Sequence, residues 1–297
     1  MNDILFSING KLVAPEHAVI PVTDRGFLYG DGLFETIHAY GKTLFRMQEH
    51  LTRAKNAARQ LFLEPMPSAS VLGRWLKEAV EAAAFSEAHV RLTITRGDGP
   101  RGPSIQGQFT PLTVISVARF QRPPDTRIKD GVMAIVASFR RQESAITARL
   151  KTLNYIEQIL AKREADLAGA DEALLLNNAG MLCEGSASNI SLIRQGILTI
   201  PDPERAGALP GIAQLTAMRA ASRLKIPVTM ASLSPWDPEN SEEAFLTGSM
   251  REITPLVRLG KKPIGSGKPG PLTLRLIGEY RRIVERECKP FKFPGSI

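Results

Sequence analysis

The sequence predicts a mixed α/β protein of two domains. Three observations predict it: the order of its helical and β-rich segments, the length of the chain, and one stretch of atypical composition. Short β-rich segments and helical patterns follow one another without the regular alternation of a dinucleotide-binding sheet. A chain of 297 residues with 43% hydrophobic content is long enough to form two compact units. Residues 119–131 combine prolines and charges with few apolar residues, which is typical of a linker. We therefore predict domains at 1–118 and 132–297.

The first domain is predicted to begin with a hairpin over residues 4–13, because two short apolar runs flank Asn9-Gly10, a pair that tolerates positive φ. Apolar side chains then recur at helical spacing in two segments, which predicts helices over 49–63 and 70–84. Two β-rich segments enclose a stretch dense in Gly and Pro, which predicts strands at 90–95 and 111–117 with a loop over 97–107.

The second domain is predicted to mix strands and helices in the same way. The same patterns predict strands at 132–137, 172–176 and 190–193, a helix over roughly 154–168 and another helix after Gly211. No internal repeat or low-complexity segment is evident.

The composition argues against several classes of protein. The net charge of +8 is spread along the chain, so a solvated basic surface explains it better than a nucleic-acid site. The two cysteines are far apart, and the four histidines have no ligand-like spacing, so we expect neither a disulfide framework nor a metal. The N-terminal residues lack the apolar core of a signal peptide, and no stretch reaches membrane-spanning length, so we expect a cytoplasmic protein.

Lys151 is the first candidate for chemistry, because it precedes a helical pattern in a region apolar enough to bury it. A desolvated lysine loses its charge readily and can then attack an aldehyde carbon. The alternative is a lysine at a strand end whose amine reaches solvent, which is common.

Glu184 precedes a run of small residues that ends in Ser188 and Asn189, and a carboxylate in such a place could bind the protonated nitrogen of a cofactor ring. A polar turn with Glu184 in solvent is the alternative. Gly211 leads into a helix whose first amides, those of Ile212 and Ala213, could bind a phosphate group. An ordinary Pro-Gly turn would have the same sequence.

Three further segments could bind anions or approach a ligand closely. Residues 247–250, which include Ser249 and Met250, are small or hydroxyl-bearing apart from the methionine. Arg53 and Arg101 could each clamp an anion through two hydrogen bonds, although surface arginines are commoner.

Taken together, these segments resemble the class IV pyridoxal-phosphate enzymes, which include branched-chain aminotransferases, D-amino acid aminotransferases and 4-amino-4-deoxychorismate lyases. The resemblance runs nearly end to end and depends on six motifs in the family's order: Asp24-Arg25-Gly26 with residues 29–36, residues 50–53, residues 151–154, residues 184–189, residues 209–212 and residues 252–255.

The resemblance implies a fold type IV enzyme, with a small N-terminal α/β domain, a larger C-terminal pseudo-barrel domain, pyridoxal 5′-phosphate in the cleft between them and a homodimer. Lys151 matches the lysine that carries the cofactor as a Schiff base, and Glu184 matches the acid on the ring nitrogen. The remaining cofactor positions are Arg53, Ser188, Asn189, Leu209, Gly211, Ile212, Ala213 and Ser249. Ala213 offers only its backbone, whereas some members have a side-chain donor there.

The residues that match substrate-binding positions of the family are Phe34, Arg91, Arg101 and Met250. D-amino acid enzymes bind the substrate carboxylate with a Tyr, an Arg and a His, which match Phe34, Arg101 and Pro103 here. The loss of two donors weakens such a trap, so a standard D-alanine enzyme is not expected. Arg91 matches a branched-chain arginine near the carboxylate, and it could equally be structural.

We therefore expect transfer of an amino group between an amino acid and a 2-oxo acid by a ping-pong route, with the hand of the amino acid open. The spacing of Lys151 and Asn154 is that of the D-amino acid enzymes and the lyases, whereas branched-chain enzymes usually have one residue more, which weakens the branched-chain interpretation. Residues 151–158 also resemble the lyases, so a lyase that removes pyruvate from 4-amino-4-deoxychorismate is the alternative enzyme. A non-catalytic basic binding protein with the same fold is the alternative of another class. We expect small-molecule partners and no nucleic acid or membrane.

Overall fold

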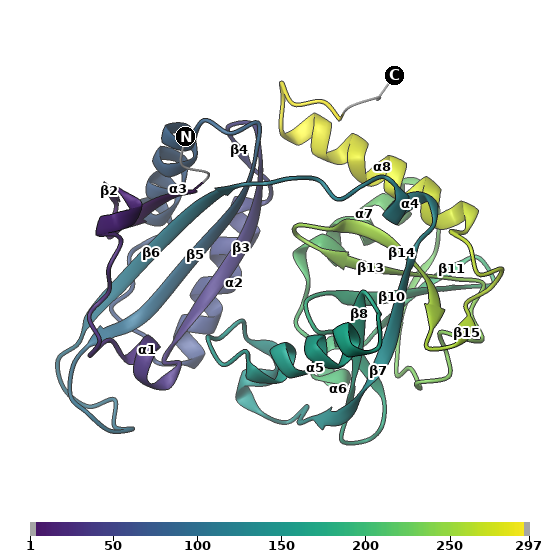
Figure 1. The fold of residues 1–297 in the computed structure, drawn as a ribbon, viewed down its shortest axis with the longest axis horizontal. Coiled ribbons are helices and arrows are strands. Elements are labelled where there is room, and N and C mark those ends of the chain that lie inside the picture. Colours follow the sequence, from purple (N-terminus) through teal and green to yellow (C-terminus); the bar gives the residue numbers. More distant parts are fainter. Residues whose placement is uncertain (1–3, 294–297) are drawn as a thin grey trace. The chain divides into compact units, whose positions relative to one another are not determined.

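The computed structural model describes residues 4–293, and these form two compact units (Figure 1). Of the described residues, unit 1 contains 4–121, 150–154 and 285–293, and unit 2 contains 122–149 and 155–284. Chain order alone does not suggest that residues 150–154 belong with unit 1. A search of the described residues finds no helix with the length and apolar character needed to span a membrane.

Unit 1 is built on a six-stranded antiparallel sheet with the strand order β2-β1-β6-β5-β3-β4. Its strands are β1 (Ile4–Ile8), β2 (Lys11–Val13), β3 (Gly32–Tyr40), β4 (Thr43–Leu44), β5 (Glu87–Asp98) and β6 (Thr110–Arg119). The predicted hairpin is confirmed, because Asn9 and Gly10 both have positive φ and Phe6 pairs with Val13.

The two helices predicted for the first half of the chain are confirmed as α2 (Met47–Gln60) and α3 (Ala69–Ala83). Their apolar faces pack with the sheet in one core, in which Leu51 of α2 and Leu76 of α3 are buried together with Ile37 of β3. A short helix, α1 (Arg25–Tyr29), precedes β3, and a 3₁₀ turn, η1 (Pro15–His17), follows β2. The core thus supports β3 and β5 from one side.

Two features of unit 1 differ from the expectation. β5 continues to Asp98, so the first residues of the predicted loop 97–107 belong to the strand, and the pairing shifts between Thr95 and Asp98. β3 was not predicted at all. Eight of its nine residues are buried, so its sequence lacks the alternation of apolar and polar residues that a half-exposed strand has.

Unit 2 is built on a nine-stranded sheet with the order β12-β11-β10-β13-β14-β7-β8-β9, and β15 also pairs with β14. The strands are β7 (Val132–Arg141), β8 (Glu172–Asn177), β9 (Leu182–Gly185), β10 (Asn189–Arg194), β11 (Ile197–Pro201), β12 (Val228–Ala231), β13 (Glu243–Gly248), β14 (Glu252–Leu259) and β15 (Lys262–Pro263). The end strand β9 contacts β10 and β11, so the sheet curls back on itself. The expected mixed α/β fold with a pseudo-barrel is confirmed.

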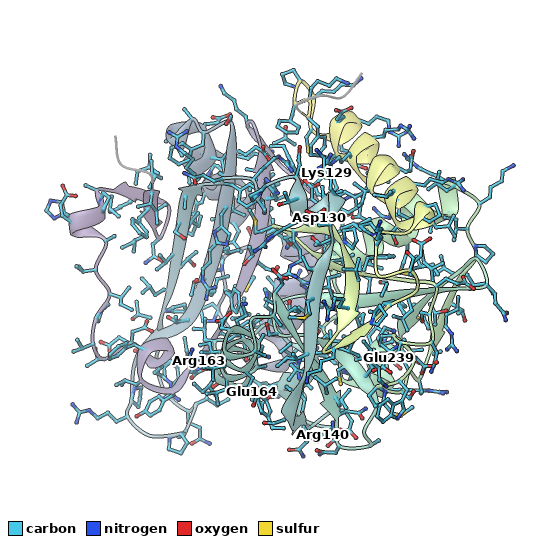
Figure 2. The ribbon with its side chains drawn as sticks, turned by 45° about the vertical axis from the view of Figure 1, so that its right-hand side comes forward. Lys129, Asp130, Arg140, Arg163, Glu164 and Glu239 are labelled. Atoms are coloured by element: carbon cyan, nitrogen blue, oxygen red, sulfur yellow. The ribbon has the colours of Figure 1, made fainter. Side chains whose placement is uncertain are left out.

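The helices of unit 2 lie against this curled sheet. They are α4 (Thr126–Lys129), η2 (Ile146–Arg149), α5 (Ile156–Leu167), α6 (Pro203–Ala206), α7 (Ile212–Arg223) and α8 (Pro271–Glu287), which ends within unit 1. The carboxylate of Glu164 on α5, labelled in Figure 2, accepts hydrogen bonds from the backbone N and the hydroxyl of Ser138 in β7. This contact ties α5 to the sheet.

The helix predicted to start near residue 154 begins two residues later, at Ile156. The reason is tertiary, because Thr152 forms a β-bridge with Leu33 and the amide N of Leu153 donates to the carbonyl O of Gly32. The segment that carries Lys151 is therefore extended.

Candidate active site

The backbone of Lys151 is held along β3 by hydrogen bonds. The amide N of Phe34 donates to the carbonyl O of Lys151 at 2.9 Å, and the amide N of Leu153 donates to the carbonyl O of Gly32 at 3.0 Å. A Cβ on Gly32 would lie 2.5 Å from the carbonyl O of Ile94 and 2.9 Å from the Leu153 side chain. Glycine is therefore required there for the Lys151 segment to approach β3.

Phe34 brings Lys151 and Arg91 together. Lys151 Nζ lies 4.3 Å from the centroid of the Phe34 ring, and Arg91 Cζ lies 3.7 Å from the same centroid. Phe34 pairs with Thr93 and Thr36 pairs with Arg91, so Phe34 and Arg91 point to the same face of the sheet. The Nε of Arg91 also donates to Thr93 Oγ1 at 3.2 Å. An amine and a guanidinium are thus fixed around one buried ring.

Arg53 is held along one edge by Glu35, a buried residue of β3. The Nε of Arg53 donates to Glu35 Oε1 at 2.8 Å, and its Nη2 donates to Oε2 at 2.7 Å. Burial by itself would raise the pKa of Glu35, but the charge and hydrogen bonds of Arg53, with a hydrogen bond from His50, lower it to about 2. The carboxylate is ionised at neutral pH and fixes the plane of the guanidinium.

His50 completes this cluster on the first turns of α2. Its Nδ1 lies 2.7 Å from Glu35 Oε2, so Nδ1 carries the proton and donates to the carboxylate. Burial lowers the pKa of His50, more than the contact with Glu35 raises it, so the ring is neutral at pH 7. The His50-Leu51-Thr52-Arg53 motif thus supplies two donors to one acid.

In unit 2, Glu184 at the end of β9 is buried and accepts from three groups. Arg141 of β7 donates one hydrogen bond to Glu184 Oε1 and another to the carbonyl O of Ala148. The amide N of Leu209 donates to Glu184 Oε2 at 2.9 Å, and Asn189 Nδ2 donates to the same oxygen at 3.4 Å. Asn189 also donates to the carbonyl O of Leu209 at 2.8 Å. The structure therefore joins Glu184, Asn189 and Leu209 in one network.

The start of α7 has the features of an anion site. Gly211 is the N-cap residue and offers no side-chain cap, and Ile212 and Ala213 are buried. The first amides of a buried helix need acceptors, and the helix dipole favours a negative one. The chemistry of this segment therefore fits a phosphate group.

Other predicted positions have different surroundings. The hydroxyl of Ser188 donates to Glu172 Oε2 at 2.7 Å. Ser249 and Met250 lie in the turn between β13 and β14, and both are partly exposed. Arg101 is exposed in the loop between β5 and β6.

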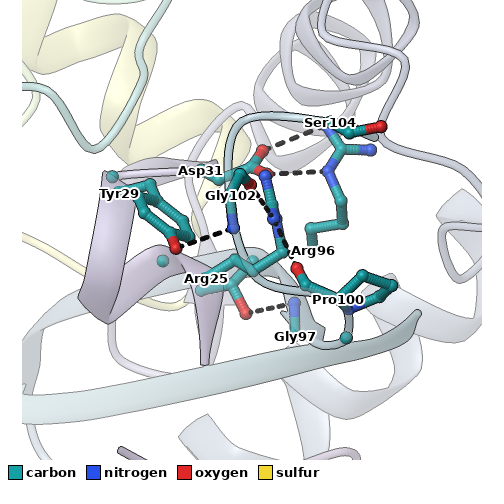
Figure 3. A network of polar contacts seen from close by, with 12 residues as sticks. Arg25, Tyr29, Asp31, Arg96, Gly97, Pro100, Gly102 and Ser104 are labelled. Atoms are coloured by element: carbon teal, nitrogen blue, oxygen red, sulfur yellow. Dashed lines mark hydrogen bonds and ion pairs between the residues drawn. The ribbon is translucent and has the colours of Figure 1, made fainter. Parts of the chain in front are cut away.

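The loop that carries Arg101 is anchored by Arg25, whose Nη1 donates to the carbonyl O atoms of Pro100 and Gly102 at 2.9 and 2.7 Å. Arg25 and Arg96 also converge on Asp31, as Figure 3 shows. Arg25, which belongs to the family motif Asp24-Arg25-Gly26, therefore binds the loop on both sides of Arg101.

Sequence reasoning missed three residues of these networks, namely Glu35, Arg141 and Glu172. Glu35 lies between Phe34 and Thr36, inside a motif that the resemblance used, and its place in that motif could have identified it. Arg141 has no local signal, because its partner Glu184 lies 43 residues further along the chain.

The residues fit pyridoxal 5′-phosphate. A buried carboxylate in Glu184 suits a protonated ring nitrogen, an uncapped helix start suits the phosphate, and an amine on Lys151 suits the aldehyde.

The model of amino-transferase class IV matches residues 32–259. The chain belongs to this family. It is 33% identical to a putative branched-chain-amino-acid aminotransferase of Methanocaldococcus jannaschii, over 93% of this chain and 95% of that one. It is 28% identical to a D-alanine aminotransferase of Bacillus licheniformis, over 89% and 92%.

Solved structures of both aminotransferases and a lyase share the fold of this chain. The branched-chain amino acid aminotransferase of T.th., solved with pyridoxamine 5′-phosphate, matches with a TM-score of 0.89 and 28% identity, over 96% of this chain and 95% of that one. The 4-amino-4-deoxychorismate lyase of Pseudomonas aeruginosa matches with a TM-score of 0.83 and 29% identity, over 94% and 98%. The protein is a pyridoxal-phosphate-dependent aminotransferase that moves an amino group between an amino acid and a 2-oxo acid.

Proposed function

We propose that this aminotransferase acts on L-amino acids in the manner of the branched-chain enzymes, with a 2-oxo acid as the amino acceptor. The observation that carries this proposal is the placement of Lys151 and Arg91 around the ring of Phe34. A guanidinium close to the reacting amine is a suitable partner for a substrate carboxylate, because it can donate two parallel hydrogen bonds.

Specificity for D-amino acids has weaker support. Phe34 has no hydroxyl, and its ring is already engaged by two cations, so it offers no hydrogen bond to a carboxylate. Pro103 likewise has no side-chain donor, and Arg101 is exposed. Arg91 is therefore the better candidate for carboxylate binding in this chain, with Met250 and Arg101 as further substrate contacts.

When bound, pyridoxal 5′-phosphate supplies an electron-accepting ring that stabilises negative charge at the substrate α-carbon. Lys151 Nζ would hold the cofactor through its aldehyde and would move the proton of the substrate α-carbon. The carboxylate of Glu184, which accepts a hydrogen bond from Arg141, would bind the ring nitrogen and favour its protonated form.

The phosphate group would be bound by Arg53, Ser249 and the amides of Ile212 and Ala213 at the start of α7. Glu35 fixes the guanidinium plane of Arg53, and the Gly211 N-cap leaves the helix amides to an anion. Ser188 and Asn189 would act mainly through Glu172 and Glu184, and Leu209 would pack against the ring.

We also propose that the active enzyme is a cytoplasmic homodimer. Large apolar side chains are exposed on α1 and α5, including Phe27 at 66%, Ile156 at 63% and Ile159 at 59%. Exposed apolar surface of this kind favours association with a second copy. Size-exclusion chromatography with light scattering tests the dimer, and a monomer that is fully active would contradict it.

A lyase acting on 4-amino-4-deoxychorismate is the second candidate. It has the support of the similar Pseudomonas aeruginosa structure and of the spacing between Lys151 and Asn154, whose Nδ2 donates to the carbonyl O of Gly30 at 3.2 Å. The two activities need the same lysine, so they are distinguished by substrate and product.

The test is the absorbance spectrum of the pyridoxal-phosphate form after separate additions of L-glutamate, L-leucine, L-alanine and D-alanine, without any oxo acid. Conversion to the pyridoxamine form by L-glutamate and L-leucine is expected. Conversion by D-alanine alone would contradict the L-specific proposal. No conversion together with pyruvate release from 4-amino-4-deoxychorismate would favour the lyase.

Lys151→Ala is the matching variant, and Lys162→Ala, a change of a partly exposed lysine on α5, is its control. After borohydride reduction, the mass of the cofactor is expected on wild type and on the Lys162 variant, and not on Lys151→Ala. Unchanged labelling of Lys151→Ala would remove Lys151 from its role.

A further inference from the structure

The carboxylate of Glu172, which accepts from Ser188, connects two turns of unit 2. Glu172 at the start of β8 has 0% exposure, and its two oxygens accept from five donors. Oε1 accepts from the amide N of Ala173 at 3.1 Å, from the amide N of Ser186 at 3.0 Å and from the Ser186 hydroxyl. Oε2 accepts from the Ser188 hydroxyl at 2.7 Å and lies 3.1 Å from Arg251 Nη2. Such a complete set of donors offsets the cost of burying this carboxyl group.

The first of the two turns joins β9 to β10. It contains Ser186 and Ser188, and it lies between Glu184 and Asn189, which share a hydrogen bond. Gly185 is packed so closely here that a Cβ would collide with the Ser188 hydroxyl and lie 3.0 Å from the Glu172 carboxyl carbon. The turn is therefore built tightly around the carboxylate.

The second turn joins β13 to β14 and contains Ser249 and Met250. The next residue, Arg251, reaches Glu172 through its side chain, and its amide N donates to the carbonyl O of Gly248 at 3.1 Å. A single carboxylate thus connects the turn that follows Glu184 with the turn that carries Ser249 and Met250.

We infer that Glu172 is a positioning residue, which aligns the 186–189 turn and the 249–251 turn so that their cofactor and substrate contacts are held at a fixed spacing. This inference rests on the proposed function, because that function assigns Ser249 and Met250 to cofactor and substrate. Glu172 itself touches neither. Its effect passes through Ser188 on one side and Arg251 on the other.

The conservative variant Glu172→Gln removes the carboxylate and keeps the size and shape of the side chain. An amide has one acceptor oxygen and one donor nitrogen, so its NH2 group must face either the backbone amides of Ala173 and Ser186 or the guanidinium of Arg251. Either orientation sets donor against donor and loosens one of the two turns.

Glu243→Gln is a matched control. Glu243 is also a buried carboxylate of unit 2, and it accepts from the amides of Leu272 and Thr273 at the start of α8. The same chemical change there lowers stability without touching either turn. We would measure four quantities for wild type and both variants: the dissociation constant of pyridoxal 5′-phosphate, kcat and KM for the amino acid, and the melting temperature of the cofactor-free protein.

Both variants are expected to melt at lower temperature, and only Glu172→Gln is expected to weaken cofactor binding, by roughly tenfold or more. Arg251→Gln is the second variant, because its side chain is 25% exposed and its loss is easier to accommodate. We expect it to raise KM for the amino acid with a smaller change in kcat, and Arg251→Lys to recover part of that loss.

The inference would be overturned if Glu172→Gln and Glu243→Gln had the same cofactor affinity and the same KM. It would also be overturned if Arg251→Gln had the KM of wild type. If Glu172→Gln does not fold, the Arg251 variants decide. If the wild-type protein does not bind pyridoxal 5′-phosphate, both the proposed function and this inference are overturned. If wild type binds the cofactor and Glu172→Gln binds it equally well, only the inference is overturned.

Discussion

Arg141 of β7 and Glu184 of β9 form a buried ion pair in unit 2, although 43 residues separate them along the chain. The side chain of Arg141 is 6% exposed and that of Glu184 is 9% exposed. Removal of one partner from such a pair leaves the other charge buried without compensation. If Glu184 binds the ring nitrogen of the cofactor as proposed, Arg141 orients the carboxylate for that contact.

The first prediction concerns this pair. Arg141→Gln is expected to lower kcat by roughly 10- to 100-fold, because the charge of Glu184 is no longer stabilised and its carboxylate is less well oriented. The measurement is the rate of the half-reaction with L-glutamate. Arg140→Gln, a change of the exposed neighbour on the same strand, is the control and should stay near wild type (Figure 2). Equal rates for the two variants would contradict the role of Arg141.

The second prediction concerns pH and Glu35. The pKa of Glu35 falls from an ordinary 4.5 to about 2 on folding, so its contribution to stability is present above pH 4.5 and is lost as the pH falls toward 2. We expect the melting temperature of wild type to decline through this window. Glu35→Gln should show a shallower decline, and a decline as steep as that of wild type would contradict the assignment. Glu49→Gln, at a partly exposed site on α2, is the control.

The third prediction concerns the two thiols. Burial, aided by the charge of Glu184, raises the pKa of Cys183 to about 12, and burial with Glu287 raises that of Cys288 to the same value. Thiolate is the reactive form, so both cysteines should resist a thiol reagent at pH 8 in the native protein and react after unfolding in denaturant. The thiol of Cys183 also donates to the carbonyl O of Ala206 at 2.7 Å. Rapid labelling of the native protein at either cysteine would contradict this prediction.

The fourth prediction concerns the loop that carries Arg101. Arg25 holds the carbonyl groups on both sides of that residue, so Arg25→Gln should release the loop and speed trypsin cleavage after Arg101 by about tenfold. The masses of the fragments identify the bond that is cut. Arg74→Gln, at an exposed site on α3, is the control. An unchanged cleavage rate in Arg25→Gln would mean that other contacts hold the loop.

Several elements could be predicted from local pattern because their physical cause is local. Asn9-Gly10 adopts the positive φ values that a tight hairpin needs, and the apolar spacing of α2 and α3 matches the face that each buries. β3 could not be predicted in this way, because burial on both faces removes the alternation that marks a strand.

The same distinction between local and tertiary causes holds for the residues of the candidate site. Lys151, Glu184 and the helix start at Gly211 could be named from the sequence, since each is a residue type that the chemistry requires within a short motif. Their supporting partners could not, because Arg141 and Glu172 meet the residues they stabilise only after β7, β8 and β9 have paired.

The sequence by itself thus determined the family, the cofactor and the residue types that carry the chemistry. Only the tertiary structure decided which donors hold each buried acid and which turns are held together. Local motifs reflect backbone conformation and chemical need over a few residues, whereas charge compensation depends on groups that the curled sheet brings within hydrogen-bond distance, such as Glu172 and Arg251.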